Sequence, residues 1–275
     1  DALMLEHVIV TAFGLEKDEA TLAYSVQKIK GEERNRVKEV NMIAALAGKA
    51  AGVQINKNSS GMGGSAKVSL RGIRSVSGDN QPLYVIDGVP MSNTSSEQAY
   101  SAIGGTANAG NRDGGDGISN LNPEDVESIS ILKGAPAAAL YGSMAANGVI
   151  LITTKKGNSV GQRNINFSTG LTFEKAFSMP NMQNRYGVSD VVDSWGEKEN
   201  LMAYDNLNDF FRTGLTSMTS VSISYGNENL QTYFSYANTT GKGIIDKNKL
   251  KKHNINLRET ATMLDKRLKL DGSVN

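Results

Sequence analysis

The sequence contains no cysteine, which excludes a disulfide framework and a thiolate metal site. It also lacks any apolar run close to the roughly 18 residues that a transmembrane helix requires. Lysine and arginine number 29 and acidic residues 28, so no basic excess points to nucleic acid as a partner. The only histidines are His7 and His253, and neither has other ligands nearby in the sequence, so we predict no histidine metal site. Aromatic residues are scarce at 6%, while 29 glycines suit tight turns better than a large aromatic core.

The most informative stretch runs from residue 81 to residue 157. Residues 83–86 (LYVI) form a short apolar, β-branched run that ends in an Asp87-Gly88 turn, which predicts a strand. Residues 149–154 are apolar and β-branched with almost no polar alternation. Such a run predicts a strand that is covered on both faces.

Two short helices are predicted between these strands. Asn122 can cap the first, with Pro123 in the first helical position and two acids at the positive end of the helix dipole. This helix must be short, because residues 128–132 return to a strand-like pattern. Pro136 begins the second helix and Gly142 ends it.

The residues before position 81 predict further small elements. Residues 24–29, 53–55 and 68–70 read as strands. Asn41 can cap a helix whose apolar face carries Ile43, Leu46, Ala47 and Ala50. Together with residues 81–157, these elements predict an α+β domain, a small mixed sheet with short helices.

Residues 5–11 (LEHVIVT) are apolar and β-branched, and a flexible GLEKDEA stretch follows them after two residues. They can be the first strand of the domain. Alternatively, they are an extended peptide that adds a strand to the sheet edge of a partner. The residues alone leave both interpretations open.

A different pattern begins after residue 158. Apolar and polar residues alternate strictly in several segments of up to about ten residues, as in a transmembrane β-barrel. A soluble sandwich also alternates, but the Asn, Ser and Thr of the polar face suit a wet lumen. About five such strands cannot close a barrel, and an open edge in lipid leaves backbone groups unsatisfied. We therefore expect further strands in a longer chain or in another polypeptide. The segments span residues 163–174, 220–225, 232–236, 254–258 and 268–274.

Two glycine-rich loops, residues 57–66 and 91–120, interrupt the first domain. A loop as long as the second is either functional or disordered. Its Asn111, Asp113 and Asp116 offer oxygen ligands, but their spacing does not match a calcium-binding EF-hand loop, so we predict no metal. The strand, glycine turn and helix of a dinucleotide site do not follow one another here, and we predict no cofactor.

The motifs YVIDGVP and ESISILKGAPAAALYGSMAANGVILITTKKG resemble the plug domain of TonB-dependent outer-membrane transporters. The Gln-Pro before the first strand and the Ala-Ala-Asn-Gly before the last resemble the SusC/RagA type found in Bacteroidetes. The resemblance implies a plug followed by antiparallel strands of a transmembrane β-barrel, which has about 22 strands in this family. It divides the chain into a TonB box and linker (residues 1–20), the plug (21–157) and the first part of the barrel (158–275).

The resemblance also implies functional residues. It assigns TonB binding to the box formed by Leu5, Glu6, His7, Val8, Ile9, Val10 and Thr11. It places the strand–Arg71-Gly72–strand passage in the plug sheet, where Arg71 is expected to pair with acidic residues of the barrel wall and hold the plug. The two glycine-rich loops are expected to face the outside and meet the substrate through Asn58, Ser59, Ser60, Asn93, Tyr100, Asn108, Asn111, Arg112 and Asp113.

The function implied is active import of a nutrient, a glycan or a peptide, across the outer membrane of a Gram-negative bacterium. The expected partners are TonB with its ExbB/ExbD energy source, a SusD-like surface lipoprotein, the substrate and outer-membrane lipid. We find no catalytic triad and no supported acid pair, so we predict no enzyme. Three alternatives remain: a siderophore or cobalamin transporter, a scaffold in an envelope complex, and a soluble glycine-rich α/β enzyme.

Overall fold

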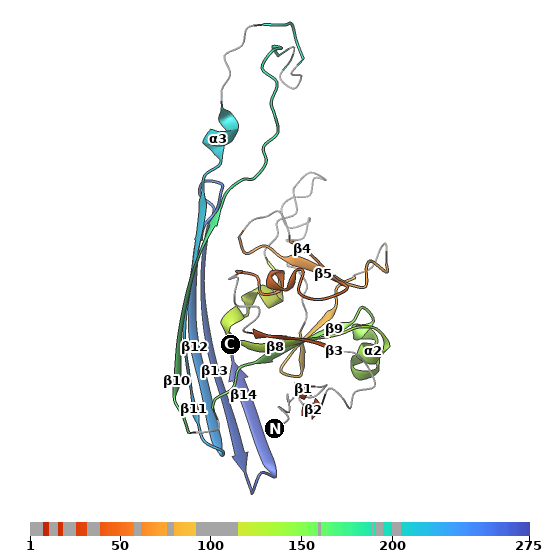
Figure 1. The fold of residues 1–275 in the computed structure, drawn as a ribbon, viewed down its shortest axis with the longest axis vertical. Helices are drawn as coiled ribbons and strands as arrows, with labels where there is room; N and C mark the ends of the chain where they lie inside the picture. The colour runs from red at the N-terminus through yellow and green to blue at the C-terminus, as the bar shows by residue number, and fades with distance from the viewer. Residues whose placement is uncertain are drawn as a thin grey trace, which may run out of the picture.

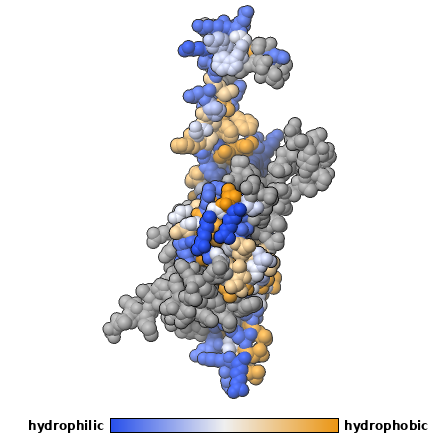
Figure 2. All heavy atoms as spheres, turned by 90° about the vertical axis from the view of Figure 1, so that its right-hand side faces the viewer, coloured by the Kyte–Doolittle hydropathy of each residue, from blue (hydrophilic) through white to orange (hydrophobic). Residues whose placement is uncertain are grey.

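The computed structural model describes residues 8–10, 16–18, 26–31, 39–57, 62–75, 80–91, 115–158, 161–188, 190, 195–199 and 205–275. Two parts lie side by side in it (Figure 1). One is a group of short strands and helices, which we call the plug. The other is a tall sheet of long strands, which we call the barrel wall. Viewed from the plug side, hydrophilic and hydrophobic residues intermingle over the middle of the molecule (Figure 2).

The plug is built on a mixed five-stranded sheet. β6 runs parallel to β9, and every other neighbouring pair is antiparallel. This confirms the α+β prediction and the strands expected near residues 24–29, 83–86, 128–132 and 149–154. The strand order is β3 (Val26–Lys30), β8 (Val126–Leu132), β9 (Val149–Thr154), β6 (Leu83–Ile86) and β7 (Val89–Met91).

The central strand β9 is covered on both faces, as its unbroken apolar run predicts. Ile150 and Ile152 belong to one cluster of buried apolar side chains. Val149 and Leu151 belong to another, on the opposite face. Because side chains alternate along a strand, one apolar run supplies both cores.

Short helices connect these strands, and the predicted caps are present. The Asn122 side chain accepts a hydrogen bond from the backbone of Glu124 at 3.2 Å. The helix that begins after Asn41 is shorter than predicted, because the backbone leaves helical geometry at Ala47 and Gly48 has a positive φ of 74°. No helix of the described residues is long and apolar enough to cross a membrane. The helices are η3 (Ala44–Leu46), η5 (Gly117–Asn120), η6 (Pro123–Asp125), α2 (Ala135–Tyr141), η7 (Gly142–Ala145) and, after the plug, α3 (Asn206–Phe210).

One expectation about the plug sheet was wrong. β4 (Val53–Lys57) and β5 (Ala66–Leu70) pair only with each other among the described residues, and they form a separate two-stranded sheet. The buried face of β5, which includes Val68 and Leu70, packs onto the first core cluster. Burial of that apolar face therefore places the hairpin over the main sheet instead of at its edge.

The barrel wall is a five-stranded antiparallel sheet in sequence order. This confirms the strands predicted from the alternating pattern. Short connections, residues 227–229 and 264–267, join strands at one end, and longer ones, residues 175–213 and 243–248, join them at the other (Figure 1). The strands are β10 (Asn164–Glu174), β11 (Gly214–Gly226), β12 (Leu230–Lys242), β13 (Lys249–Met263) and β14 (Leu268–Val274).

The two faces of this sheet differ in the way that the alternation predicts. The face turned from the plug carries exposed apolar side chains, including Ile165, Phe167, Ile223, Phe234 and Ile255. The face turned toward the plug carries buried polar side chains, including Ser220, Ser222, Ser235, Asn256 and Thr260. An apolar outer face and a polar inner face are the arrangement of a transmembrane barrel wall around a plug.

Candidate functional site: the contact between plug and barrel wall

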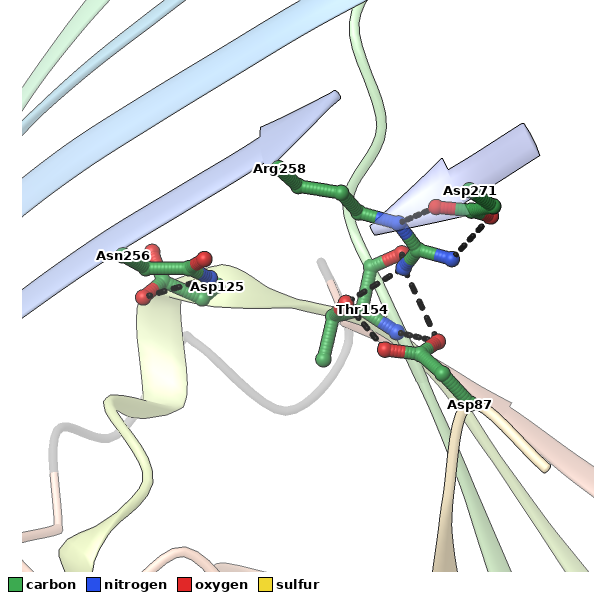
Figure 3. Close-up of polar contacts among 6 residues, drawn as sticks. All are labelled: Asp87, Asp125, Thr154, Asn256, Arg258 and Asp271. Carbon is green, nitrogen blue, oxygen red and sulfur yellow. Dashed lines mark hydrogen bonds and ion pairs between the residues drawn. The ribbon is translucent and has the colours of Figure 1, made fainter. Parts of the chain in front are cut away.

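The plug and the barrel wall meet at a buried charged cluster, which we call the Arg258 cluster. It consists of Asp87, Thr154, Arg258 and Asp271 (Figure 3). Asp87 and Thr154 belong to the plug, and Arg258 and Asp271 belong to β13 and β14. Polar contacts that join the two parts directly determine how the plug is held against the wall.

The tight β6–β7 turn places Asp87 in the cluster. Asp87 has φ 47° and Gly88 φ 87°, the left-handed backbone that a two-residue hairpin requires and that Asp and Gly tolerate. The Asp87 carboxylate accepts hydrogen bonds from the Thr154 backbone N–H at 3.0 Å and from its hydroxyl at 2.6 Å. The turn and the end of β9 therefore hold the Asp87 carboxylate in place through contacts within the plug alone.

Arg258 connects this carboxylate to the barrel wall. Its Nη1 lies 2.9 Å from Asp87 Oδ1 and donates to the Thr154 hydroxyl and carbonyl at 2.6 and 3.1 Å. Its Nε and Nη2 form a bidentate pair with the two oxygens of Asp271, at 2.8 and 2.7 Å. Asp271 is diagonal to Arg258 across the strands, since Arg258 faces Ser273 in the register.

The cluster is mostly shielded from water. The side chain of Arg258 is 5% exposed, that of Asp87 15% and that of Asp271 29%. The Arg258 guanidinium therefore forms ion pairs with two carboxylates at a site that water reaches poorly. Each charge there needs its partner, because water does not replace a lost ion pair. Separation of plug and wall removes Asp87 and Thr154 from Arg258 and leaves Asp271 with it.

A second buried contact lies further along β13. Asp125, 1% exposed, accepts a hydrogen bond from the Tyr233 hydroxyl at 3.0 Å and a longer one from Asn256 Nδ2 at 3.4 Å. The Asp125 carbonyl also accepts from the Lys155 backbone at 2.8 Å. The backbone of Asp125 is therefore held within the plug, while both donors to its carboxylate come from the barrel wall.

Four alternate residues of β13 carry this contact surface. Besides Asn256 and Arg258, the Lys252 ammonium donates to the Ser119 carbonyl at 2.5 Å, and the Asn254 amide donates to the Asn120 carbonyl. Residues two apart share one face of a strand, so a single strand presents four polar anchors to the plug in a row.

Glycines permit close approach at this boundary. A Cβ on Gly157 would lie 2.3 Å from the backbone nitrogen of Thr232 in β12, a distance that real Cβ atoms essentially never show. A Cβ on Gly241 would lie 2.4 Å from the Met62 sulfur of the plug. Gly157 is rigidly enclosed by backbone, whereas the Gly241 neighbour is a movable side chain.

A cavity of about 110 Å³ remains between plug and wall at the end with the long connections. Its polar lining includes Glu39, Asn41 and Ser65 of the plug and Glu174 at the end of β10. Its lining offers carboxylate, amide and hydroxyl groups for hydrogen bonding.

Arg71, the residue expected to lock the plug, lies elsewhere. It is exposed, and its guanidinium is beside Gly134, where a Cβ would be 2.8 Å from Nη1. Burial lowers the pKa of the adjacent Lys133, and the positive charge of Arg71 lowers it further. Among the described residues, no ion pair joins Arg71 to the five strands of the wall. Its pairing with another part of the barrel stays a prediction.

The central residues of the expected TonB box are extended. β1 (Val8–Val10) pairs antiparallel with β2 (Glu16–Asp18), in a two-stranded sheet separate from the plug sheet. The first-strand interpretation places this segment in the plug sheet, where the described residues do not have it. Leu5, Glu6, His7 and Thr11 lie outside the described residues, and TonB binding stays a prediction.

The expected substrate-facing residues also lie outside the described residues: Asn58, Ser59, Ser60, Asn93, Tyr100, Asn108, Asn111, Arg112 and Asp113. Asp116, next to them, is described. Its carboxylate accepts from the backbones of Ser119 at 2.9 Å and Ala66 at 3.2 Å, so it fixes the plug fold. Within the described part of the chain, no group of three or more His, Cys, Asp or Glu residues could hold a metal ion.

Sequence reasoning missed the Arg258 cluster. It identified Asp87 as a turn residue and Arg258 as a member of a polar face, without connecting them. One signal was available: Arg258 is a charged residue among Asn, Ser and Thr on a face that must be covered, and a buried charge requires a partner. The partner could not be identified from the sequence pattern, because Thr154, to which Arg258 donates, lies 104 residues away in the chain.

Comparisons with known proteins agree with this architecture. The model of the TonB-dependent Receptor Plug Domain family matches residues 18–149. The chain is 31% identical over 283 residues to the TonB-dependent receptor SusC of Bacteroides thetaiotaomicron, which covers 98% of this chain and 26% of SusC. A shorter match, 33% identical, covers 52% of this chain and 18% of the ferric enterobactin receptor PirA of Pseudomonas aeruginosa.

A solved structure shows the same fold. The RagAB peptide importer in its open-open state aligns with a TM-score of 0.69 at 23% identity, over 94% of this chain and 30% of that one. The chain thus spans about a quarter of the length of SusC. The match to SusC over nearly the whole chain, with the plug match and the observed fold, shows that this chain belongs to the SusC/RagA-type TonB-dependent receptors.

Proposed function

We propose that the full-length protein actively imports a nutrient, an oligosaccharide or a peptide, across the outer membrane of a Gram-negative bacterium of the Bacteroidetes type. The observation that carries the proposal is the nature of the contact between plug and barrel wall. Within the part of the chain that the structure describes, both clusters of buried apolar residues consist of plug residues alone. The hydrogen bonds and ion pair that join plug and wall are concentrated on β13, with Tyr233 of β12 beside it.

This division suits a gate. A plug with its own apolar core keeps its fold when it moves. A core shared with the wall would expose apolar surface to water as the two parts separated. Hydrogen bonds and ion pairs at the boundary can be exchanged for bonds to water when the plug shifts. The contacts therefore hold a closed state that a pulling force can open.

The force would come from TonB, energised by ExbB and ExbD. Residues 5–11 precede the plug, and their central part forms a strand outside the plug sheet. An extended segment of this kind can add to the sheet edge of TonB. We propose residues 1–20 as box and linker, 21–157 as the gate and 158–275 as the first part of the enclosing barrel.

The substrate and surface partner follow from the relatives. RagAB is described as a peptide importer, and the match to SusC covers 98% of this chain. A SusD-like surface lipoprotein is therefore the expected partner at the outer end. Substrate would first meet the loop residues assigned above and then the polar cavity beside Glu174, which favours a ligand rich in hydrogen-bonding groups.

Two other functions remain to be compared with nutrient import. A siderophore receptor is supported by the match to PirA, but that match covers only about half of this chain. A scaffold role would need the plug contact but neither TonB nor a substrate. The first relative is described as a TonB-dependent receptor, and import itself requires no covalent step.

The test uses a strain that lacks the gene and is complemented with the full-length protein. Val8→Pro with Val10→Pro removes two backbone N–H donors from the box, whereas Val8→Thr with Val10→Thr keeps them. We expect the proline variant to lose uptake of labelled oligosaccharide or peptide and to lose TonB in pull-downs. The threonine variant should retain both.

Several outcomes would redirect the proposal. Equal uptake by the proline and threonine variants would refute strand addition at the box. If the proline variant lost uptake of iron–siderophore complexes but not of oligosaccharide or peptide, the siderophore alternative would be established. Pull-downs that contain envelope proteins but neither TonB nor a SusD-like lipoprotein would establish the scaffold.

A further inference from the structure

The outer face of the barrel wall changes character along β12 and β13. Near the end with the long connections, three cross-strand pairs on this face are polar or basic: Asn238 with His253, Thr240 with Lys251, and Lys242 with Lys249. All three lysines are exposed. They share a face with Tyr236 and Ile255, because residues two apart along a strand point to the same side.

This end of the sheet is the outer one. Transmembrane barrels have short turns on the periplasmic side and longer loops outside. The turns at 227–229 and 264–267 are the short ones, and Lys242 and Lys249 flank the longer connection at 243–248. The lysines therefore belong to the half of the wall that faces the outer leaflet.

The lysines also lie at the edge of the apolar band. Phe234 and Tyr236 pair with Leu257 and Ile255, and these exposed residues form the band on the two strands. Lys251 is four residues beyond Ile255, which is about 13 Å along a strand. At the usual tilt of such strands the rise is about 10 Å, which brings the ammonium groups to the level of lipid headgroups.

The local excess of positive charge formed by these lysines favours binding of an anion. Lys242 and Lys249 face each other directly across the strands, and like charges in this position are destabilising. On the described outer face their neighbours in β10 and β11 are apolar or neutral, as with Phe173, Leu215 and Ser217. The nearby Asp246 is paired with Arg212 at 2.6 Å. The whole chain has a net charge of only +1, so this concentration is local.

We propose that Lys242, Lys249 and Lys251 bind the phosphate groups of an anionic glycolipid in the outer leaflet. A phosphate between Lys242 and Lys249 relieves their repulsion, and Thr240 and Asn238 offer hydrogen-bonding groups to the attached sugar. The acyl chains then lie on the apolar band below. This site depends on the orientation of the barrel wall and is independent of what the protein imports.

The test uses the full-length protein in detergent and native mass spectrometry. The probes are monophosphorylated lipid A and the same lipid after removal of its phosphate. Each basic residue near an anionic surface contributes about fivefold in affinity, so replacing all three lysines by glutamine should weaken binding of the phosphorylated lipid roughly 100-fold. Arginine at the same three positions should retain binding, and the dephosphorylated lipid should bind weakly to every variant.

A matched control carries Gln in place of Lys67, Lys266 and Lys269, which changes the net charge equally at places away from the outer end of β12 and β13. It should bind the phosphorylated lipid as the native protein does. Equal weakening in the control, or unchanged binding after substitution of Lys242, Lys249 and Lys251, would overturn the proposal. Binding of inorganic phosphate without binding of the lipid would overturn it as well. A heat-dependent shift in gel mobility verifies that each barrel is folded.

Discussion

Replacing Arg258 with methionine should loosen the plug without disturbing its fold. Methionine keeps much of the length of the arginine side chain and removes its charge and donors. The change takes away the ion pair with Asp87 at 2.9 Å, the two hydrogen bonds to Thr154 and the bidentate pair with Asp271. It leaves two carboxylates close together without their cation.

The magnitude follows from burial. Removing one partner of a buried ion pair costs about 3–5 kcal/mol, and Arg258 is only 5% exposed, so little of this is screened by water. Asp87→Asn should cost about 1.5–3 kcal/mol, the range for a hydrogen bond to a charged group, since asparagine tolerates the φ of 47° and keeps an acceptor. The double variant should cost little more than Arg258→Met alone, which gives a coupling energy of about 1.5–3 kcal/mol.

The assay is a urea titration of the full-length protein in detergent, with hydrogen exchange of the plug strands β6, β8 and β9 as the readout. Gel mobility with and without heating reports on the barrel separately. Asp246→Asn is the control, because it breaks the exposed pair with Arg212 and should cost less than about 1 kcal/mol.

A specific result would refute this reasoning. If the two single changes add within about 0.5 kcal/mol in the double variant, Asp87 and Arg258 do not interact across the boundary. Equal effects of Asp246→Asn and Asp87→Asn would mean that burial does not strengthen the cluster.

Three further predictions concern the boundary and the outer face. Tyr233→Phe removes the hydroxyl that donates to a buried plug carboxylate, and we expect the same urea assay to show a loss of about 1–3 kcal/mol. Gly157→Ala introduces a Cβ into the backbone of β12 and should reduce the yield of heat-modifiable folded protein, whereas Gly272→Ala, with open space around it, should leave it unchanged. Phe167→Arg on the outer face should destabilise the barrel by about 2–4 kcal/mol if it lies near the bilayer midplane, while Asn166→Arg on the other face should cost less in the same measurement.

Much of the fold could be predicted because its signals are local. The caps at Asn122 and Gly142, the turn at Asp87 and the unbroken run of β9 are each set by a few neighbouring residues. The alternation after residue 163 likewise fixes which side chains share a face, since a strand has a period of two. These features need no knowledge of distant partners.

The candidate site was predicted poorly, because its contacts join segments far apart in the chain. The side chains of Thr154 and Arg258 are hydrogen-bonded across 104 residues, and those of Tyr233 and Asp125 across 108. Local pattern marks Arg258 as inward-facing but does not identify the carboxylate it meets. Similarly, β5 was recognised as a strand but assigned to the main plug sheet, whereas it pairs with β4, since pairing depends on which face buries apolar surface.

The sequence by itself thus determined the elements, the two faces of every barrel strand and the family resemblance that the comparisons confirm. Only the tertiary structure decided that β13 anchors the plug, that Arg258 serves Asp87 and Asp271 together, and that Lys242 faces Lys249 on the outside. The reason is that strand periodicity depends on neighbouring residues alone. Register and charge pairing depend on which distant strands come together when apolar surface is buried.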